Sequence, residues 1–275
     1  MNKKIGFILA LVVISLLMLG TVSAGLFDFL GGSSGNQTAN DDDTFIVGFD
    51  AEFPPYGYKD DSGNYTGFDL DLAKEVCERN NWTFKAQPID WDAKDAELDS
   101  GSIDCIWNGF TIDGRENDYT WSNPYFDNKQ IFVVKSDSDI KTIADLSGKT
   151  VETQKDSSAL AALQGDNKTI ADKFATLTEV ADYNTAFMDL ESGACDAVAM
   201  DIGVAEYDID NKNNTDDFAI LNESITTEKY GIGFKKGNDA LKDQVQSTLD
   251  EMFKDGTVVK IAEKYGISQD ALIQP

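Results

Sequence analysis

One short pattern occurs twice in this chain, and it constrains the fold more than any other feature. Residues 98–106 (LDSGSIDCI) and residues 190–198 (LESGACDAV) align almost residue for residue, about 90 positions apart. Each copy predicts the end of a helix, a glycine in the left-handed conformation that closes it, and then a buried strand. Gly101 and Gly193 are the two closing glycines. Two such copies predict two similar α/β lobes with a cleft between them.

The order of the predicted elements supports this architecture. Strand-like apolar runs alternate with helical periodicity from residue 44 onward, and the alternation restarts near residue 133. Such alternation favours largely parallel sheets flanked by helices. We expect lobe 1 at residues 44–131 and 228–270, lobe 2 at residues 132–227 and a tail at residues 271–275, with two crossover strands as the hinge. Locally, we expect a hairpin turn at residues 59–64 and a helix capped near Asp69.

The first 24 residues differ from the rest of the chain. Two lysines precede an apolar run at residues 5–19, and residues 22–24 (VSA) have the small side chains of a cleavage site. The run is shorter than the ~20 residues of a spanning helix, so we interpret residues 1–24 as a secretory signal peptide. An uncleaved membrane anchor is the alternative, because residues 26–30 are also largely apolar. Residues 25–43 then form a flexible polar linker.

Composition excludes several classes of function. The net charge is −26, and it becomes −28 when residues 1–24 and their two lysines are removed. So acidic a chain repels phosphate backbones, which argues against nucleic-acid binding. The chain has no histidine, which excludes histidine-based catalytic triads and most zinc sites, and we expect no metal and no cofactor. We interpret Cys77, Cys105 and Cys195 as small core residues without a disulfide.

The loop after the first copy of the repeat has the residue types of a carboxylate site. Ligands collect beyond the carboxyl ends of strands in open α/β sheets. Arg115 stands out there because Arg79 is the only other arginine, and a guanidinium binds a carboxylate through paired hydrogen bonds. A surface ion pair of Arg115 and simple helix capping by one of the two serines are the alternatives. The group expected around an anion comprises Gly109, Thr111, Arg115, Ser157 and Ser158, and Asn108 of the same loop is a further candidate ligand-binding residue.

A second group suits an ammonium ion and an apolar side chain. Asp201 follows the second copy of the repeat, where it is placed to accept hydrogen bonds from an ammonium group. Phe53, in the stiff segment at residues 50–58 (DAEFPPYGY), and Trp91 are candidate aromatic walls. Ordinary core packing is the alternative for Phe53. A carboxylate clamp opposite an ammonium acceptor suits the zwitterionic head of an α-amino acid.

Several segments, in the correct order, resemble the polar amino-acid-binding proteins of ABC transporters. These proteins are the extracytoplasmic solute-binding protein family 3, with a Venus-flytrap (type II periplasmic-binding-protein) fold. The resemblance covers about residues 44–270 and is carried by residues 48–56 (GFDAEFPPY), 67–73 (GFDLDLA), 107–125 (WNGFTIDGRENDYTWSNPY), 146–151 (LSGKTV), 154–158, 199–201 (AMD) and 255–265. One departure is visible, because members commonly carry Thr-Ile-Thr-x-x-Arg, whereas residues 111–115 (TIDGR) are one residue shorter.

The resemblance implies a role for each candidate residue. Phe53 and Trp91 would sandwich the ligand side chain, and Asp201 would hold the α-amino group. The α-carboxylate would be held by Gly109, Thr111, Arg115 and Ser158. Asp50 would meet a donor on the ligand side chain, joined by Glu52 and Gln154, which favours Gln, Lys, Arg, His or cystine as the ligand.

The function implied is that of a monomeric extracytoplasmic binding protein, not an enzyme, which captures a polar or basic amino acid and delivers it to a membrane permease. Two alternatives stay open. One is an enzyme on the same scaffold, similar to cyclohexadienyl dehydratase, for which Glu52 or Glu152 would have to act as the general acid. The other is a ligand-sensing domain, against which we count the absence of a second apolar segment before Pro275.

Overall fold

The computed structural model describes residues 43–211 and 216–274. The predicted signal peptide and nearly all of the predicted linker lie outside the described residues. Within them, no helix is both long and apolar enough to cross a membrane.

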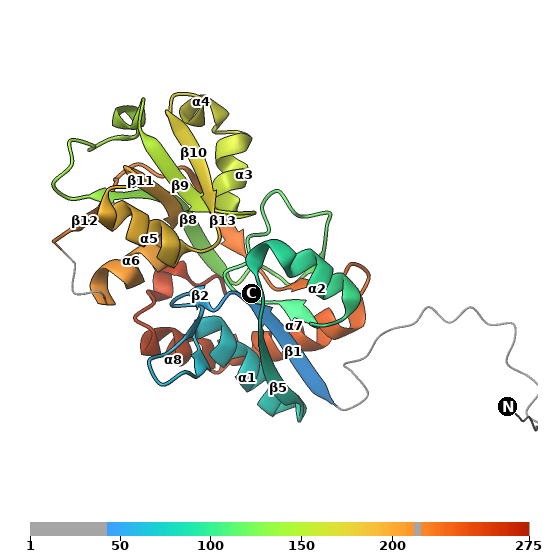
Figure 1. The fold of residues 1–275 in the computed structure, drawn as a ribbon. Helices are drawn as coiled ribbons and strands as arrows, with labels where there is room; N and C mark the ends of the chain where they lie inside the picture. Colours follow the sequence, from blue (N-terminus) through green and yellow to red (C-terminus); the bar gives the residue numbers. More distant parts are fainter. Residues whose placement is uncertain (1–42, 212–215, 275) are drawn as a thin grey trace, which may run out of the picture. The chain divides into compact units, whose positions relative to one another are not determined.

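The first sheet is built mainly from the N-terminal half of the described chain. Its strand order is β5-β1-β6-β14-β7, with β1 parallel to β5 and β6, and β14 antiparallel to β6 and β7. The strands are β1 (Thr44–Phe49), β5 (Thr83–Pro88), β6 (Cys105–Ile106), β7 (Thr120–Trp121) and β14 (Gly233–Phe234). The helices of this lobe are α1 (Phe68–Asn80), α2 (Lys94–Ser100), α7 (Asp239–Lys254) and α8 (Thr257–Lys264), with short 3-10 turns at Trp91–Ala93 and Gln269–Ala271. The first helix, α1, packs on β5, α7 and α8 (Figure 1).

The second sheet has the order β10-β9-β11-β8-β12, and β13 also pairs with β8. Strands β10, β9 and β11 are parallel, whereas β11, β12 and β13 are each antiparallel to β8. The strands are β8 (Phe126–Lys135), β9 (Thr150–Gln154), β10 (Thr176–Val180), β11 (Ala197–Asp201), β12 (Phe218–Ile220) and β13 (Thr226–Tyr230). The helices are α3 (Ser158–Gln164), α4 (Lys168–Ala171), α5 (Tyr183–Ser192) and α6 (Ile202–Asn211), with a 3-10 turn at Ile143–Leu146.

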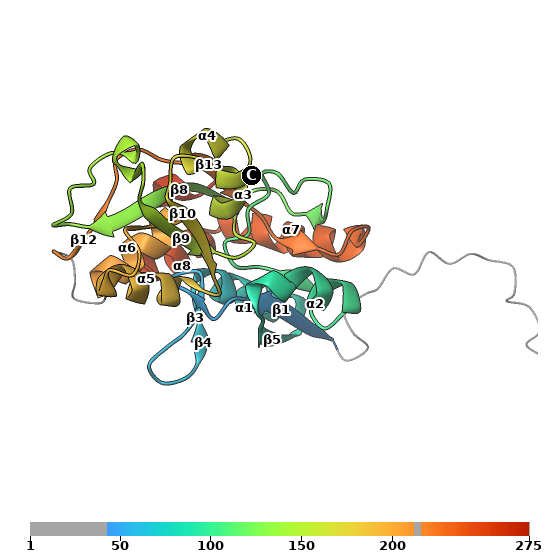
Figure 2. The ribbon, with the colours of Figure 1, turned by 45° about the horizontal axis from the view of Figure 1, so that its top comes forward.

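The chain passes between the two sheets at β7–β8 and at β13–β14, and β8 and β13 run side by side. The predicted two-lobe α/β architecture with two crossover strands is therefore confirmed, although each sheet adds antiparallel strands to its parallel core. The predicted hairpin is confirmed as well. It forms a small separate sheet of β2 (Glu52–Phe53), β3 (Gly57–Lys59) and β4 (Tyr65–Thr66), with its turn visible at the lower edge in Figure 2. At the other end of the described chain, Leu272 forms an isolated bridge with Phe126.

Both copies of the repeat form the same local structure. Gly101 closes α2 at φ 78°, and Gly193 closes α5 at φ 79°. In each copy the aspartate then ties the new strand to its neighbour. Asp104 accepts a hydrogen bond from the Ile46 N–H (2.7 Å) in β1, and Asp196 accepts one from the Thr150 N–H (2.8 Å) in β9. The repeat is thus a structural device that places a strand in the middle of each sheet.

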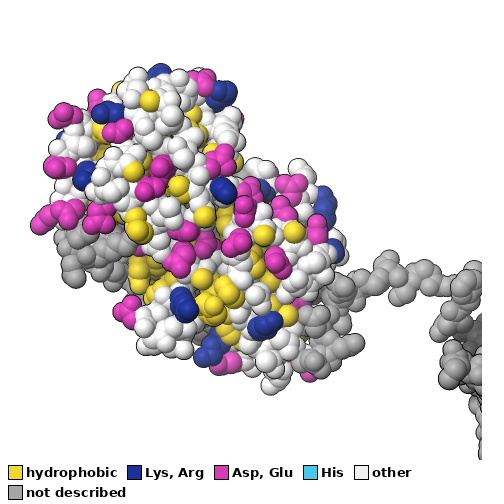
Figure 3. All heavy atoms as spheres, viewed as in Figure 1, with side chains coloured by type: hydrophobic (Ala, Val, Ile, Leu, Met, Phe, Trp, Pro, Cys, Tyr) yellow, Lys and Arg dark blue, Asp and Glu magenta, His cyan; other side chains and the backbone are white. Residues whose placement is uncertain are grey.

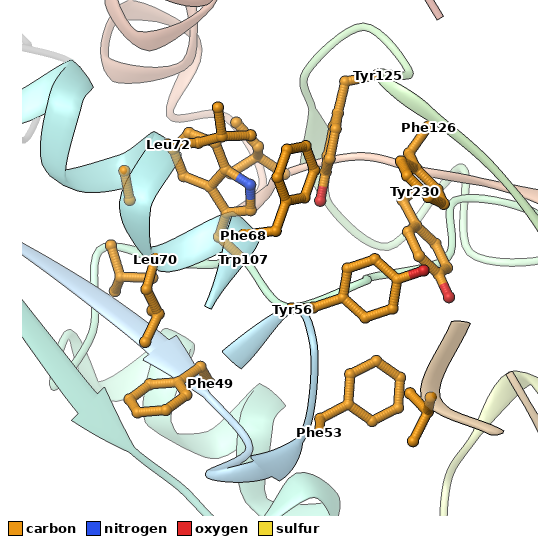
Figure 4. Packing of buried hydrophobic residues seen from close by; sticks show 14 of the residues in the cluster. Phe49, Phe53, Tyr56, Phe68, Leu70, Leu72, Trp107, Tyr125, Phe126 and Tyr230 are labelled. Atoms are coloured by element: carbon orange, nitrogen blue, oxygen red, sulfur yellow. The ribbon is translucent and has the colours of Figure 1, made fainter. Parts of the chain in front are cut away.

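The core beside the first sheet is rich in aromatic side chains. Figure 4 shows Tyr56 reaching toward Tyr230, with Phe53 beside it. The rings of Tyr56 and Tyr230 meet edge to face at 5.3 Å, and Phe126 stacks on Tyr230 at 5.4 Å. The three cysteines are buried among core residues, as expected.

Asp69 corrects a prediction about the first helix. The N-cap of α1 is Gly67, and the Asp69 side chain points into the protein instead of capping the helix. There it accepts hydrogen bonds from the Gly109 N–H (2.6 Å) and the Tyr125 hydroxyl (2.8 Å). Burial raises the pKa of Asp69 to about 7, although both hydrogen bonds favour the charged form. A residue predicted to start a helix therefore fixes the loop that follows β6.

Candidate functional site

One pocket gathers most of the residues singled out in the sequence. The space between its lining atoms, including the part that is open to solvent, is about 280 Å³. Ten of the twelve predicted site residues line it: Phe53, Trp91, Asn108, Gly109, Thr111, Arg115, Gln154, Ser157, Ser158 and Asp201. They come from loops at the carboxyl ends of β1, β5, β6, β9 and β11, five strands that belong to two different sheets. The two lobes therefore both contribute walls to the same pocket.

Asp50 and Glu52 lie just outside this pocket, in a neighbouring hollow that Trp91 also lines. Asp50 is buried, and its carboxylate accepts a hydrogen bond from Gln154 of the other lobe (2.5 Å). Burial raises the pKa of Asp50 to about 6. Glu52 is exposed, and it is hydrogen-bonded to Asn184. The acids of this hollow, which outnumber its one lysine, are Asp50, Glu52, Asp90, Asp92, Glu97 and Asp182.

Acidic side chains are also the commoner charged kind on the face of the protein in Figure 3. This agrees with the net charge of −26. Such a surface attracts cations over longer distances than a single ion pair does.

Two aromatic side chains form walls of the pocket. Phe53 is only 6% exposed, with ring centroids 5.6 Å from Tyr56 and 6.0 Å from Tyr183. Trp91 meets Phe110 edge to face at 5.5 Å, so its indole is held from one side. Phe53 therefore lines the pocket and belongs to the core at the same time, and the two interpretations weighed from the sequence do not exclude each other.

Arg115 is the single basic side chain among the described residues that line the pocket. Its guanidinium donates to the Thr111 carbonyl (3.3 Å) and to the Asp156 carbonyl of the other lobe (3.0 Å). It also lies 5.3 Å from the centre of the Phe110 ring. These contacts fix the orientation of a side chain that has five N–H donors in all, so others remain for a ligand. The shortened loop at residues 111–115 still brings Arg115 to the pocket.

Asp201 is the buried acid of the pocket wall. It lies at the end of β11, 4% exposed, and its carboxylate accepts hydrogen bonds from Asn128 (2.7 Å) and the Tyr230 hydroxyl. Burial raises the pKa of Asp201 to about 7, and the nearby Glu228 raises it further in the same direction. Asp201 has no basic partner among the residues that the structure describes, and such a buried acid is well suited to accept a ligand cation.

Gly109 differs from the expectation in one respect. Its N–H is already bound by Asp69, so this group is not available to a ligand carboxylate. Its lack of a side chain matters instead. Gly109 has φ +56°, and a Cβ there would lie 2.7 Å from the Phe53 ring and 3.2 Å from the Tyr230 ring. The glycine lets the loop pass close behind the aromatic wall.

We expect Gly109→Ala to lower the melting temperature by about 5 °C or more and to weaken ligand binding. A left-handed alanine costs about 1–2 kcal/mol, and each kcal/mol shifts the midpoint of a domain of this size by about 2–4 °C. The contact with Phe53 adds to this. Gly114→Ala is the matched control, because Gly114 has φ +82° and a Cβ added there would meet nothing within 4 Å. Equal melting temperatures for the two variants, measured by thermal denaturation, would contradict the role of the contact.

The residues behind the pocket were missed by the sequence analysis. Asn128 and Gln130 on β8, and Glu228 and Tyr230 on β13, are buried polar side chains that hydrogen-bond to pocket residues. The signal that could have found them was their period of two, because residues 128 and 130, like residues 228 and 230, share one face of a strand. A polar pair on one face of a predicted hinge strand indicates a buried polar network.

A further contact between the lobes was also missed. Lys94 on α2 is 1% exposed and ion-paired with Asp156 of the other lobe. Burial lowers the pKa of Lys94, although Asp156 opposes this. The same ammonium lies 5.1 Å from the centre of the Trp91 ring. Lys94 therefore supports one aromatic wall and holds the facing loop.

The two acids considered for an enzyme do not line the pocket. Glu152 lies on β9, where burial and then the neighbouring Asp189 raise its pKa, and Glu52 lies in the adjoining hollow. Neither is therefore placed against a substrate held in the pocket itself.

Comparison with known proteins matches this chain to solute-binding proteins. The model of the bacterial extracellular solute-binding proteins, family 3, matches residues 45–268. The L-cystine-binding protein TcyJ of Escherichia coli is 32% identical over 81% of this chain and 82% of its own length. A probable histidine-binding protein of Neisseria gonorrhoeae is 31% identical over 86% of this chain and 87% of its own length.

Solved structures of similar fold are also binding proteins. An ABC uptake transporter substrate-binding protein from Streptococcus pneumoniae, with bound histidine, has a TM-score of 0.81 and 32% identity over 84% of this chain and 95% of its own. An ancestral arginine-binding protein bound to arginine has a TM-score of 0.74 and 37% identity over 81% of this chain and 97% of its own. With the family model covering nearly all of the described residues, this chain belongs to the bacterial extracellular solute-binding proteins, family 3.

Proposed function

We propose that this protein captures a polar or basic L-amino acid between its two lobes and delivers it to the membrane permease of an ABC transporter. The observation that carries the proposal is that one basic side chain, Arg115, and one buried acid, Asp201, line the same small pocket. A zwitterionic head group matches this pair of charges. The relatives named above, which bind cystine, histidine or arginine, support the substrate class.

The remaining pocket residues fit the same ligand. The carboxylate of the amino acid would meet Arg115, and its ammonium would meet Asp201. Phe53 and Trp91 would flank its side chain. Asp50, Gln154 and Glu52 would accept or donate hydrogen bonds farther out, and the acids of the adjoining hollow favour a side chain with donors or a positive charge. The protein would act as a monomer outside the cytoplasm, and it needs no cofactor for this task.

Contacts between the lobes support capture by closure. Asp50 with Gln154, Lys94 with Asp156 and Arg115 with the Asp156 carbonyl all join residues of different lobes. They would break when the lobes separate about β8 and β13. An amino acid that touches both lobes binds the closed state better than the open one and therefore shifts the equilibrium toward closure. The closed protein would present surfaces of both lobes to the permease.

A thermal-shift screen of the purified protein tests this function. We expect at least one polar or basic L-amino acid, at 100 times its Kd, to stabilise the protein by about 2.7 kcal/mol, which raises the melting temperature by about 5–10 °C. Mass spectrometry should recover that amino acid unchanged. No shift with any amino acid would contradict the proposal, and recovery of a converted product would favour an enzyme.

A further inference from the structure

Glu228 is the centre of a hydrogen-bond network directly behind the pocket. It lies on the hinge strand β13 and is buried. One of its carboxylate oxygens, Oε1, accepts hydrogen bonds from four side chains: Thr111 Oγ1 (2.9 Å), Asn128 Nδ2 (2.7 Å), Gln130 Nε2 (2.7 Å) and Ser158 Oγ (3.1 Å). Thr111 and Ser158 line the pocket, whereas Glu228 is outside the set of described residues that do so.

The number of protons on a hydroxyl group decides what Thr111 and Ser158 can offer a ligand. Each hydroxyl has one proton to donate and two lone pairs to accept with. Both protons are directed to Glu228, because each hydroxyl is the donor and the Glu228 Oε1 atom is the acceptor in these two hydrogen bonds. Ser158 also accepts from Gln130 Nε2 (2.8 Å), which leaves one lone pair, and Thr111 keeps two. Toward the pocket, these hydroxyls are therefore acceptors.

An acceptor recognises an ammonium group and not a carboxylate. Asp201 lies in the same pocket and shares a partner with Glu228, because Asn128 Nδ2 donates to both carboxylates at 2.7 Å. The side chains that donate hydrogen bonds to these two acids, within the described part of the chain, are neutral amides and hydroxyls. Two buried acidic side chains, Asp201 in the pocket wall and Glu228 behind it, are thus linked by hydrogen bonds to the two hydroxyls.

We propose that Glu228 is a positioning residue of the amino-acid site, which fixes the Thr111 and Ser158 hydroxyls as acceptors for the ligand's ammonium group. The inference rests on the proposed function. It assigns the two hydroxyls to the ammonium, where the resemblance assigned them to the carboxylate, and leaves Arg115 as the main carboxylate partner. Thr111 lies in the loop after β6 of lobe 1, and Ser158 is the first residue of α3 in lobe 2. Glu228 therefore aligns acceptors from both sides of the pocket.

The test compares ligands that lack one end of the amino acid. The probes are L-arginine, L-argininamide and 5-guanidinopentanoate, with L-histidine, L-histidinamide and imidazole-4-propionate as a parallel set. Calorimetry measures their affinities for the wild-type protein, Glu228→Ala, Glu228→Gln and Thr111→Val. Glu179→Ala is the control, because Glu179 is an exposed acid on β10. Thermal denaturation without ligand shows whether each variant is folded.

We expect Glu228→Ala to lower the affinity for the amino acid and for its amide alike, by about tenfold or more, because both ligands have the ammonium group. The affinity for the probe without an ammonium group should change less than threefold. Glu228→Gln keeps an acceptor oxygen and should recover most of the affinity. In the double variant Glu228→Ala/Thr111→Val, the affinity for the amino acid should fall by less than the product of the two single effects, since both substitutions act through one contact.

Other outcomes would overturn the proposal. If the affinities for all three probes fall equally, Glu228 supports the fold in general. If only the affinities for the probes with a carboxylate fall, the hydroxyls bind the carboxylate. If Glu228→Ala does not fold, Glu228→Gln and Thr111→Val test the proposal instead. A Thr111→Val variant that binds the amino acid and the desamino probe with unchanged affinities refutes the ammonium contact. A wild-type protein that binds no amino acid in the thermal-shift screen refutes the proposed function itself, and this inference with it.

Discussion

Arg115→Ala is expected to weaken amino-acid binding by about 100-fold or more, the largest single loss in the pocket. Truncating one partner of a buried, hydrogen-bonded charge pair costs about 2–5 kcal/mol, and each 1.4 kcal/mol is a tenfold change in Kd. No other basic side chain of the described residues lines the pocket, so nothing there can replace the guanidinium. Isothermal titration with the amino acid that gives the largest thermal shift measures the loss.

The chain offers a matched control in its only other arginine. Arg79 lies on α1, where it is bound to Glu75 and Asp255 rather than to the pocket. Arg79→Ala should leave the affinity unchanged. Arg115→Lys keeps the charge but loses the paired geometry, so it should fall between the alanine variant and the wild type. Affinity of Arg115→Ala within twofold of the wild type would refute the carboxylate role of this residue.

Amino-acid affinity is also expected to fall by up to tenfold for each pH unit between pH 7 and pH 5. The pKa of Asp201 is raised to about 7 by burial and by Glu228, so the ligand-free protein is increasingly protonated there below pH 7. The ligand ammonium favours the ionised carboxylate and lowers its pKa, so binding must release the proton. Proton release raises affinity as the pH rises and reduces it as the pH falls. Calorimetry in buffers of different ionisation enthalpy counts the released protons.

Two variants separate Asp201 from other groups. Asp201→Asn should bind about 100-fold more weakly at pH 7.5 and show a shallower dependence on pH. The pKa of Asp50 is about 6, so its own effect begins at lower pH, and Asp50→Asn should keep the slope between pH 7 and pH 6. A wild-type affinity that stays constant from pH 7 to pH 5 would mean that Asp201 does not accept the ammonium in ionised form.

Much of the fold could be predicted because its signals are local. A glycine that closes a helix and a short apolar run before a polar loop depend only on neighbouring residues, and the structure has both, at Gly101 and at Gly193. The strands that follow enter the middle of the two sheets, so their carboxyl ends meet at the pocket. For this reason, Arg115 and Asp201 could be placed in one site before their distance in space was known.

The parts that could not be predicted depend on long-range contacts. Asp69 was expected to cap a helix, but its carboxylate is 40 positions from the Gly109 N–H that it binds. Glu228 looked like one acid among many in a charged chain, yet it accepts hydrogen bonds from residues 70 to 117 positions away. Local sequence does not contain such partners, because the side chains meet only after the two sheets have formed.

The sequence by itself determined the two-lobe class, the loops that line the pocket and the kinds of side chain in them. The tertiary structure alone decided which atoms are available to a ligand. A backbone N–H or a hydroxyl has a single proton, and burial against Asp69 or Glu228 commits that proton before any ligand arrives. The doubled pattern thus predicts where the pocket lies. The buried acids behind the pocket come together only in the folded protein, and they decide which pocket groups still have a proton to donate.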